Sequence, residues 1–214
     1  GVSTASGIPD FRGAKGIYNY TPEEVISHNF FVNHTKDFYE FYKNKLVYPN
    51  AKANLCHTWC TKLEEEKKLK AVITQNIDGL HQKAGSKNVL ELHGSVLRNY
   101  CTKCGKFYKL EELDFSNPYC TDCKGLIKPD VVLYGEGLCQ DVLSQSVKEI
   151  SKADTLIIIG TSLIVNPAAS LVTYFSGKNL VLINLDKTAY DKNCSLVINE
   201  DIIDVIKELG ELGD

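Results

Sequence analysis

Two pairs of cysteines, Cys101-x-x-Cys104 and Cys120-x-x-Cys123, constrain the fold of this chain more than any other feature. Each C-x-x-C turn can bring two sulfurs to one metal, and two such turns complete the tetrahedral shell that Zn²⁺ prefers. The segment between the pairs, residues 105–119, has a length typical of such sites. We therefore predict a zinc ion bound by four thiolates. Because no coordination position stays open for water, this zinc should be structural; a redox-active pair is the alternative.

The other four cysteines are dispersed along the chain as Cys56, Cys60, Cys139 and Cys194. Two C-x-x-C pairs among otherwise scattered thiols are more typical of a reducing compartment and a bound metal than of a disulfide scaffold. Cys56 and Cys60 are one helical turn apart in a segment expected to be a helix. This spacing favours packing in the core over metal binding.

A length of 214 residues and an apolar fraction of 43% indicate one domain of ordinary size that carries a smaller insertion. A net charge of −3 argues against nucleic acid as a direct ligand. The longest apolar run, residues 155–160, is too short to span a membrane, and no signal peptide is visible, so we expect a cytoplasmic protein. The sequence has no Met and opens on Gly1-Val-Ser, which reads like the middle of a motif. We expect residues to be missing from its front.

Helices are predicted after a Gly- and Ser-rich loop over residues 1–20. Thr21 and Pro22 form a helix-start signal, in which an N-cap residue precedes Pro in the first turn. Aromatic residues three and four positions apart predict a helix over 34–45, and apolar residues at every fourth position predict one over 51–69.

The rest of the chain alternates between short apolar runs and helical patterns. The runs are aliphatic and β-branched, as expected of strands buried on both faces, and they lie at 70–74, 89–92, 130–134, 155–159, 180–185 and 196–198. Helices are expected along the face of Leu143, Val147 and Ile150, after Asn166-Pro167, and from Asp201 to Leu209 with Gly210 at the end. This alternation predicts an α/β fold with a doubly wound parallel, Rossmann-like sheet.

Such sheets bind ligands at the carboxyl ends of their strands, so the polar segments that follow the apolar runs form the candidate site. They are TQNIDGLH at 74–81, ELHGS at 91–95, GTSL at 160–163, the residue Asn184, and the small-residue segment STASGIPDFRG at 3–13. Small residues and helix N-termini are typical of phosphate-binding sites, and the guanidinium group of Arg12 can donate paired hydrogen bonds to a phosphate. A neutral imidazole at His93 could act as a general base. On the residues alone, each segment is also compatible with a surface loop or a strand-end turn, and His93 with a structural role.

Together these segments closely resemble the sirtuin family of NAD-dependent protein deacylases. The matching segments are GVSTASGIPDFRG, TQNIDGLH, ELHGS, the two C-x-x-C pairs, KPDVVLYGE, and IGTSL followed by IN. They occur in family order over nearly the whole chain, and the ordered set is highly specific. The resemblance implies an NAD-binding Rossmann-like domain over 1–19, 70–97 and 128–214. It also implies a small domain that combines a helical module over 20–69 with a zinc-binding module over 98–127.

The resemblance also implies residue roles. His93 would be the catalytic base, and NAD would meet an acetylated-lysine protein or peptide in the cleft between the domains. The implied NAD contacts are Thr4, Phe11, Arg12, Gln75, Asn76, Ile77, Asp78, Thr161, Ser162, Asn184, Asp201 and Ile202. The implied partners of an extended substrate peptide are Val132, Gly135 and Glu136. The structural Zn²⁺ would be held by Cys101, Cys104, Cys120 and Cys123.

The implied reaction consumes NAD. The acyl oxygen attacks the ribose carbon as nicotinamide leaves, His93 deprotonates a ribose hydroxyl, and water then releases lysine and O-acetyl-ADP-ribose. The chain departs from the family pattern before Gly1, where a strand and a Gly-Ala pair normally complete the pyrophosphate site; we expect these residues to exist in the molecule. The segment 13–20 lacks the Tyr and Arg arrangement with which some relatives select acidic acyl groups. Acetyl or a longer apolar acyl group is therefore the expected substrate.

Two other functions stay open at this stage. Mono-ADP-ribosyl transfer would use the same NAD site, and a non-enzymatic zinc-ribbon module would bind a partner through the basic and aromatic residues between Arg98 and Lys109. A dehydrogenase is disfavoured because no G-x-G-x-x-G follows a predicted strand. The sequence predicts no particular oligomeric state.

Overall fold

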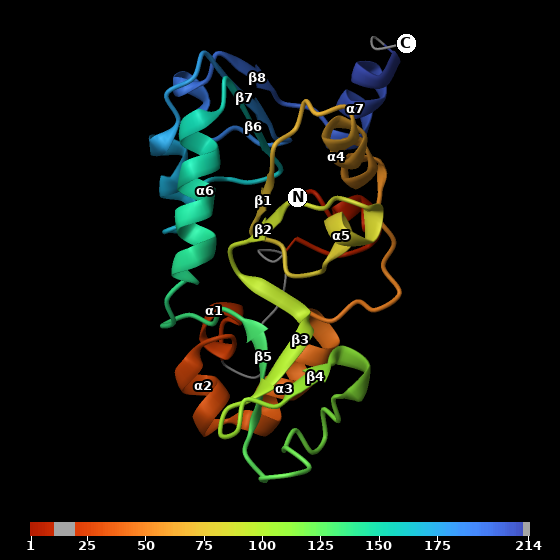
Figure 1. Ribbon diagram of the computed structural model, residues 1–214, viewed down its shortest axis with the longest axis vertical. Coiled ribbons are helices and arrows are strands. Elements are labelled where there is room, and N and C mark those ends of the chain that lie inside the picture. The colour runs from red at the N-terminus through yellow and green to blue at the C-terminus, as the bar shows by residue number, and fades with distance from the viewer. Residues whose placement is uncertain (11–19, 212–214) are drawn as a thin grey trace.

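The computed structural model describes residues 1–10 and 20–211, which form two ends joined by a long central strand (Figure 1). One end holds parallel sheets and the helices that cover them, and the other holds an antiparallel sheet and the first helices of the chain. Phe11 and Arg12, two of the predicted NAD contacts, lie outside the described residues. Within the described ranges, no helix combines the length and apolar character that crossing a membrane requires.

The predicted parallel strands form the first of these ends. They make two sheets, β1 (Val72–Thr74) with β2 (Val89–Glu91), and β6 (Thr155–Ile159) with β7 (Asn179–Ile183) and β8 (Leu196–Ile198) in that order. Leu182 in the central strand of the second sheet is completely buried, which explains why continuous aliphatic runs mark these strands in the sequence. The polar segments that follow β1 and β6 meet at one edge, because Gln75 hydrogen-bonds Thr161 there.

Helices cover these sheets on two sides. Helix α6 (Gln140–Lys152) runs along one side, and α4 (Leu55–Glu65), α5 (Leu80–Ala84) and α7 (Ile202–Glu211) group on the other (Figure 1). The helix predicted over 51–69 is shorter than expected, because Asn54 caps its start by accepting a hydrogen bond from the Cys56 amide. Helix α4 packs on α5 and α7, although the predicted domain division assigns residues 20–69 to the small domain.

The long strand β3 (Gly94–Cys101) enters the second end and pairs antiparallel with β4 (Phe107–Lys109) and β5 (Ile127–Val131). The strand predicted at 130–134 was therefore misplaced, and it belongs to this sheet and not to a parallel one. Pro129 cannot donate a ladder hydrogen bond, and the sheet tolerates it because β5 is an edge strand.

Three short helices pack on the antiparallel sheet. The capping box of Thr21 and Glu24 confirms the predicted helix start, and the helix predicted over 34–45 is present from Thr35. Its aromatic stripe is at most 1% exposed and consists of Phe38, Tyr39, Phe41 and Tyr42. The Tyr39 hydroxyl donates a hydrogen bond to the Ile127 carbonyl, which ties helix to sheet. The three helices are α1 (Pro22–Val25), α2 (His28–Asn33) and α3 (Thr35–Lys45).

Three further boundaries differ from the predictions. Asn166-Pro167 does not open an α-helix, because the segment forms a turn followed by the 3-10 helix η4 (Ala169–Tyr174). Gly210 lies within α7 and does not end it. His93 does not end a strand, because β2 stops at Glu91 and His93 lies in the turn before β3. Short 3-10 segments and α-helices begin with the same polar and Pro residues, so the start signal does not separate them.

Gly94 permits the turn that carries His93. Its backbone is left-handed, with φ of +72°, and a Cβ there would overlap the carbonyl oxygen of Asp130. We expect Gly94→Ala to destabilise the fold by on the order of 3 kcal/mol, because backbone strain and the clash act together. Gly137→Ala is the matched control, since a Cβ at Gly137 meets nothing within 4 Å. Urea unfolding compares the two variants, and equal stabilities would contradict this explanation of the turn.

Candidate active site

One large cleft, with a volume of about 1720 Å³, is lined by residues of both parallel sheets and of the segment after β5. It is lined by the predicted catalytic base His93 and by every predicted NAD- or peptide-binding residue that the structure describes. These are Thr4, Gln75, Asn76, Ile77, Asp78, Val132, Gly135, Glu136, Thr161, Ser162, Asn184, Asp201 and Ile202. These residues are distant in the sequence. The fold brings them together because the carboxyl ends of parallel strands meet at one edge of a sheet.

His93 is positioned by a backbone hydrogen bond. Its Nδ1 donates to the carbonyl oxygen of Gln75 at 3.0 Å, which leaves Nε2 as the acceptor of the neutral ring. Burial lowers the pKa of His93, and the bond to Gln75 only partly opposes this effect. The imidazole is therefore uncharged at neutral pH and can accept a proton from a ligand in the cleft, which is what a general base requires.

Ser3 is the centre of a polar network that lines the same cleft as His93. Its hydroxyl donates to Asp78 Oδ2 at 2.7 Å and accepts from Asn76 Nδ2 at 3.0 Å. The other oxygen of Asp78 accepts from the Leu80 amide at 2.9 Å. The orientation of both predicted ligand-binding side chains therefore depends on a serine from the first turn of the chain.

His57 supports this network from α4. Its Nε2 lies 3.5 Å from the Ser3 hydroxyl, and its Nδ1 lies 3.0 Å from Asn54 Oδ1. Asn54 in turn donates to the carbonyl of Val2 at 2.8 Å and to the hydroxyl of Ser6 at 2.9 Å. No sequence motif marks Asn54 or His57 as a site residue. The only sequence signal is a helix-cap residue three positions before a histidine, which is common in helices without any site.

The buried imidazole of His57 makes stability depend on pH. Burial, and to a lesser degree the neighbouring His81, lower the pKa of His57 from 6.5 to about 4. Between these values the unfolded chain binds a proton that the folded chain does not. Stability is therefore complete above about pH 6.5 and falls by on the order of 1 kcal/mol per unit as pH decreases toward about 4. The lowered pKa of His93 acts in the same direction.

This dependence can be measured by urea unfolding at about pH 7 and about pH 5. The stability difference between the two pH values should shrink in His57→Gln and stay unchanged in His34→Gln, since His34 is exposed. An undiminished difference in the His57 variant would show that another group causes it.

Four hydrogen bonds hold other predicted cofactor-binding residues in place along the cleft. The Gln75 amide donates to Thr161 Oγ1 at 3.4 Å, which links the segments after β1 and β6. Asn184 Nδ2 donates to the Asp186 carbonyl at 2.6 Å. Asp201 accepts from the Ile203 amide at 2.8 Å, at the start of α7. Thr4 donates to the Gly1 carbonyl at 2.7 Å.

Gly160 allows three segments to meet in this part of the cleft. A Cβ at Gly160 would lie 2.8 Å from the Val2 nitrogen and 3.0 Å from the Ile202 side chain. Only a glycine therefore lets the end of β6, the first residues of the chain and α7 approach this closely.

The segment after β5 is held by Glu136. Its carboxylate accepts from the Leu133 amide at 2.9 Å, lies 2.8 Å from His28 Nδ1, and pairs with Lys128 at 3.0 Å. The Val132 amide donates to the His93 carbonyl at 3.1 Å, which connects this segment to the turn of the candidate base. The carboxylate of Glu136 thus shapes the turn around Gly135, whose φ is +91°.

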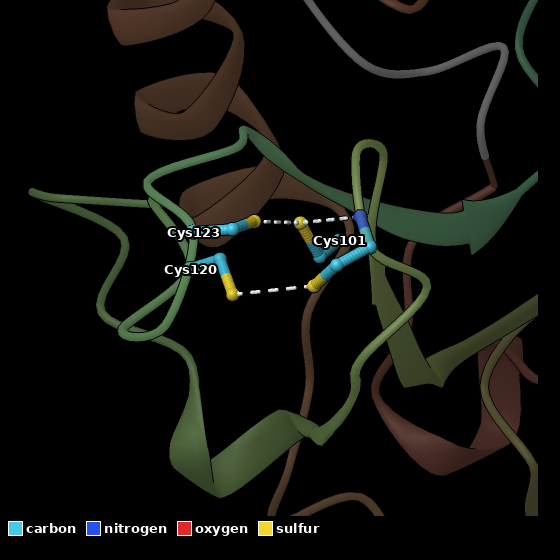
Figure 2. A group of neighbouring side chains, drawn as sticks. Cys101, Cys120 and Cys123 are labelled. Carbon is cyan, nitrogen blue, oxygen red and sulfur yellow. Dashed lines mark hydrogen bonds between the residues drawn. The ribbon is translucent and has the colours of Figure 1, made fainter.

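The four predicted metal ligands converge outside the cleft. The sulfurs of Cys101 and Cys123 are 3.4 Å apart and those of Cys104 and Cys120 are 3.7 Å apart, and all four lie within 4.8 Å of one another (Figure 2). Sulfurs bound to one tetrahedral zinc at about 2.3 Å lie about 3.8 Å from each other. Both the type of donor and the spacing therefore fit Zn²⁺.

Neighbouring residues prepare these sulfurs for a metal. The Tyr108 hydroxyl donates to Cys120 Sγ at 3.2 Å, and this bond is the main reason that the pKa of Cys120 is lowered to about 6. A lowered pKa favours the thiolate that a metal binds. Gly125 leaves room beside the ligands, because a Cβ there would lie 2.8 Å from the Cys101 sulfur.

Known proteins similar to this chain identify its family. The model of the Sir2 family matches residues 1–167. The NAD-dependent protein deacetylase of Clostridium acetobutylicum is 55% identical over 216 residues, which cover 97% of this chain and 88% of that protein. A solved structure of Sir2 bound to acetylated peptide has a TM-score of 0.90 at 42% identity and covers 99% of this chain and 89% of that one. The same values describe a structure of Sir2 with a p53 peptide and NAD+. This chain belongs to the Sir2, or sirtuin, family.

Proposed function

We propose that this protein is an NAD-dependent protein-lysine deacetylase that produces nicotinamide, O-acetyl-ADP-ribose and unmodified lysine. The observation that carries the proposal is a neutral, partly buried His93 in the same cleft as the network of Ser3, Asn76 and Asp78. Membership of the Sir2 family supports it, as does a relative of that name that matches nearly the whole chain.

In the proposed reaction, His93 takes the proton of a ribose hydroxyl at Nε2, since Nδ1 is occupied by the Gln75 carbonyl. A bound NAD would supply both the ribose carbon that the acyl oxygen attacks as nicotinamide leaves and the ribose hydroxyl that receives the acyl group. Asn76 and Asp78, held by Ser3, bind the carboxamide end, with Ile77 lining the pocket. Gln75 and Thr161 contact the ribose and phosphates. The other proposed cofactor contacts are Thr4, Phe11, Arg12, Ser162, Asn184, Asp201 and Ile202.

The substrate is proposed to be an extended peptide with acetyl-lysine that pairs with the backbone of residues 132–136. Glu136 would act by holding this segment in shape, because its carboxylate already has three partners within the chain. The zinc held by Cys101, Cys104, Cys120 and Cys123 is proposed to be structural, because the four sulfurs complete its shell.

We also propose that the chain divides into a Rossmann-like domain and a small domain, and that the protein is cytoplasmic. The parallel sheets support the larger domain, and the antiparallel sheet with α1–α3 supports the smaller one. The packing of α4 on α5 and α7 favours moving residues 55–65 into the larger domain. Truncation at this boundary followed by limited proteolysis would test it.

The test of function is incubation of the full chain with NAD and an acetyl-lysine peptide. Nicotinamide release should depend on the acetyl group and should yield O-acetyl-ADP-ribose in equal amount. Transfer of labelled ADP-ribose to protein without deacetylation would support the ADP-ribosyltransferase instead. Absence of NAD binding in calorimetry would support the non-enzymatic zinc-ribbon module.

A further inference from the structure

Arg98 lies on the long strand β3, which joins the two ends of the molecule (Figure 1). Its guanidinium group binds two carboxylates, because Nη1 donates to Glu91 Oε2 at 2.8 Å and Nε donates to Asp130 Oδ2 at 2.7 Å. The second oxygen of Glu91 accepts from Gln82 Nε2 of α5 at 2.8 Å. These four side chains form one network, the Arg98 brace, which connects a helix and a strand of the parallel end with two strands of the antiparallel sheet.

The Arg98 brace spans the turn of the candidate base. Glu91 is the last residue of β2, Arg98 lies on β3, and the turn with His93 connects these two strands. The bond between Glu91 and Arg98 therefore joins the strand before the turn to the strand after it. Asp130 extends the brace to β5, just before the segment that starts at Val132. The brace thus fixes the base turn relative to the proposed peptide-binding segment.

A bulge in β3 places Arg98 in this network. Residues 96–98 bulge out of the ladder between β3 and β5, because the register of the two strands shifts there. Such bulges bend a strand and change the direction of its side chains. The Val96 amide donates to the Ile77 carbonyl at 2.9 Å, in the segment after β1. Backbone bonds thus hold the bulge against the proposed carboxamide pocket, and the side chain of Arg98 ties it to β2 and β5.

Burial makes the carboxylate of Glu91 depend on Arg98. The side chain of Glu91 is 9% exposed, whereas that of Asp130 is 40% exposed. A buried carboxylate that loses its cation either stays as an uncompensated charge or moves toward water, and both outcomes are costly. Gln82 offers it only a neutral donor. Loss of the guanidinium group should therefore displace the end of β2, and with it the base turn, whereas Asp130 can be hydrated where it is.

We propose that Arg98 is a positioning residue for catalysis, which holds the turn of His93 through the buried carboxylate of Glu91. The described residues that line the cleft include none of the four members of the Arg98 brace. The brace therefore acts on the orientation of the base and not on a bound ligand. Its effect on turnover rests on the proposed deacetylase function.

The experiment compares Arg98→Met with the double variant Arg98→Met/Glu91→Gln, as zinc-loaded full chains, in steady-state assays with NAD and an acetyl-lysine peptide. Arg98→Met should lower kcat by on the order of tenfold to a hundredfold, because a displacement of about 1 Å at a reacting group has costs of this size. KM for both substrates should change little, since the brace does not line the cleft. The double variant should regain most of the lost kcat, because Gln removes the buried charge and keeps an oxygen that can accept from Gln82.

Urea unfolding of the same variants measures the brace without turnover. Arg98→Met should unfold at a lower urea concentration than the native chain, and the added Glu91→Gln should raise this midpoint again. Lys207→Met is the matched control, because it removes the cation of an ion pair with Asp204 whose side chains are 58% and 64% exposed. It should leave both kcat and the midpoint unchanged.

Native kcat in Arg98→Met would overturn the positioning role, and so would a loss confined to KM. A double variant with lower kcat than Arg98→Met would show that Arg98 does not act through Glu91. If Arg98→Met does not fold, Glu91→Gln alone replaces it in the comparison. Adding Arg98→Met to Glu91→Gln should then lower kcat little further, and a large additional loss would contradict the proposal. Failure of the deacetylase function is distinguishable, because the unchanged chain would then lack turnover while the urea midpoints still report the brace.

Discussion

Replacement of His93 by Ala is expected to lower kcat/KM for deacetylation by about a hundred- to ten-thousand-fold, the usual contribution of a positioned general base. The backbone bond to Gln75 and the cleft position give the ring one available acceptor, and Ala removes it without altering the turn that Gly94 permits. NAD affinity should change little, because binding does not require proton transfer. Steady-state kinetics and calorimetry measure the two effects separately.

The pH profile provides a second test of the same residue. Because burial lowers the pKa of His93, the base stays neutral below the usual value of 6.5, and activity should persist there until the ring is protonated. An exposed histidine serves as the control, and His34→Ala should leave kcat/KM unchanged. Full activity of His93→Ala would refute the assignment of the base.

Removal of the zinc is the other change expected to have a large effect. Structural zinc sites contribute on the order of 10 kcal/mol or more, which is comparable to the whole stability of a domain. The sulfurs join the end of β3 to the segment before β5, and the core beneath includes Cys101 and Cys120 at 3% and 0% exposure. Stripping the metal with a chelator should unfold this end and abolish activity by loss of structure.

Circular dichroism, zinc content and turnover, recorded together, measure this effect. Cys120→Ser should behave like the stripped protein, whereas Cys139→Ser, which changes an exposed thiol outside the cluster, should keep its zinc and its fold. Undiminished turnover after complete zinc removal would show that the cluster does not support the active site.

Much of this architecture was predictable because its signals are local. The spacing within and between the C-x-x-C pairs predicted the cluster of four sulfurs, and aliphatic runs predicted the parallel strands. Burial on both faces leaves a continuous apolar run, and a metal-binding turn needs its ligands at a set spacing. The segments that follow β1 and β6 could likewise be placed at one cleft, since parallel strands have a common carboxyl edge.

Tertiary structure decided the rest. The strand at 127–131 pairs antiparallel with β3, which begins directly after the turn of His93. An apolar run in the sequence does not indicate which strand it pairs with or in which direction. Ser3, Asn54 and His57 come together where the first turn of α4 meets the start of the chain, through contacts between residues about fifty positions apart. Short-range sequence patterns thus determined which segments carry the reactive side chains, while long-range packing determined how those side chains are oriented and which of them are charged.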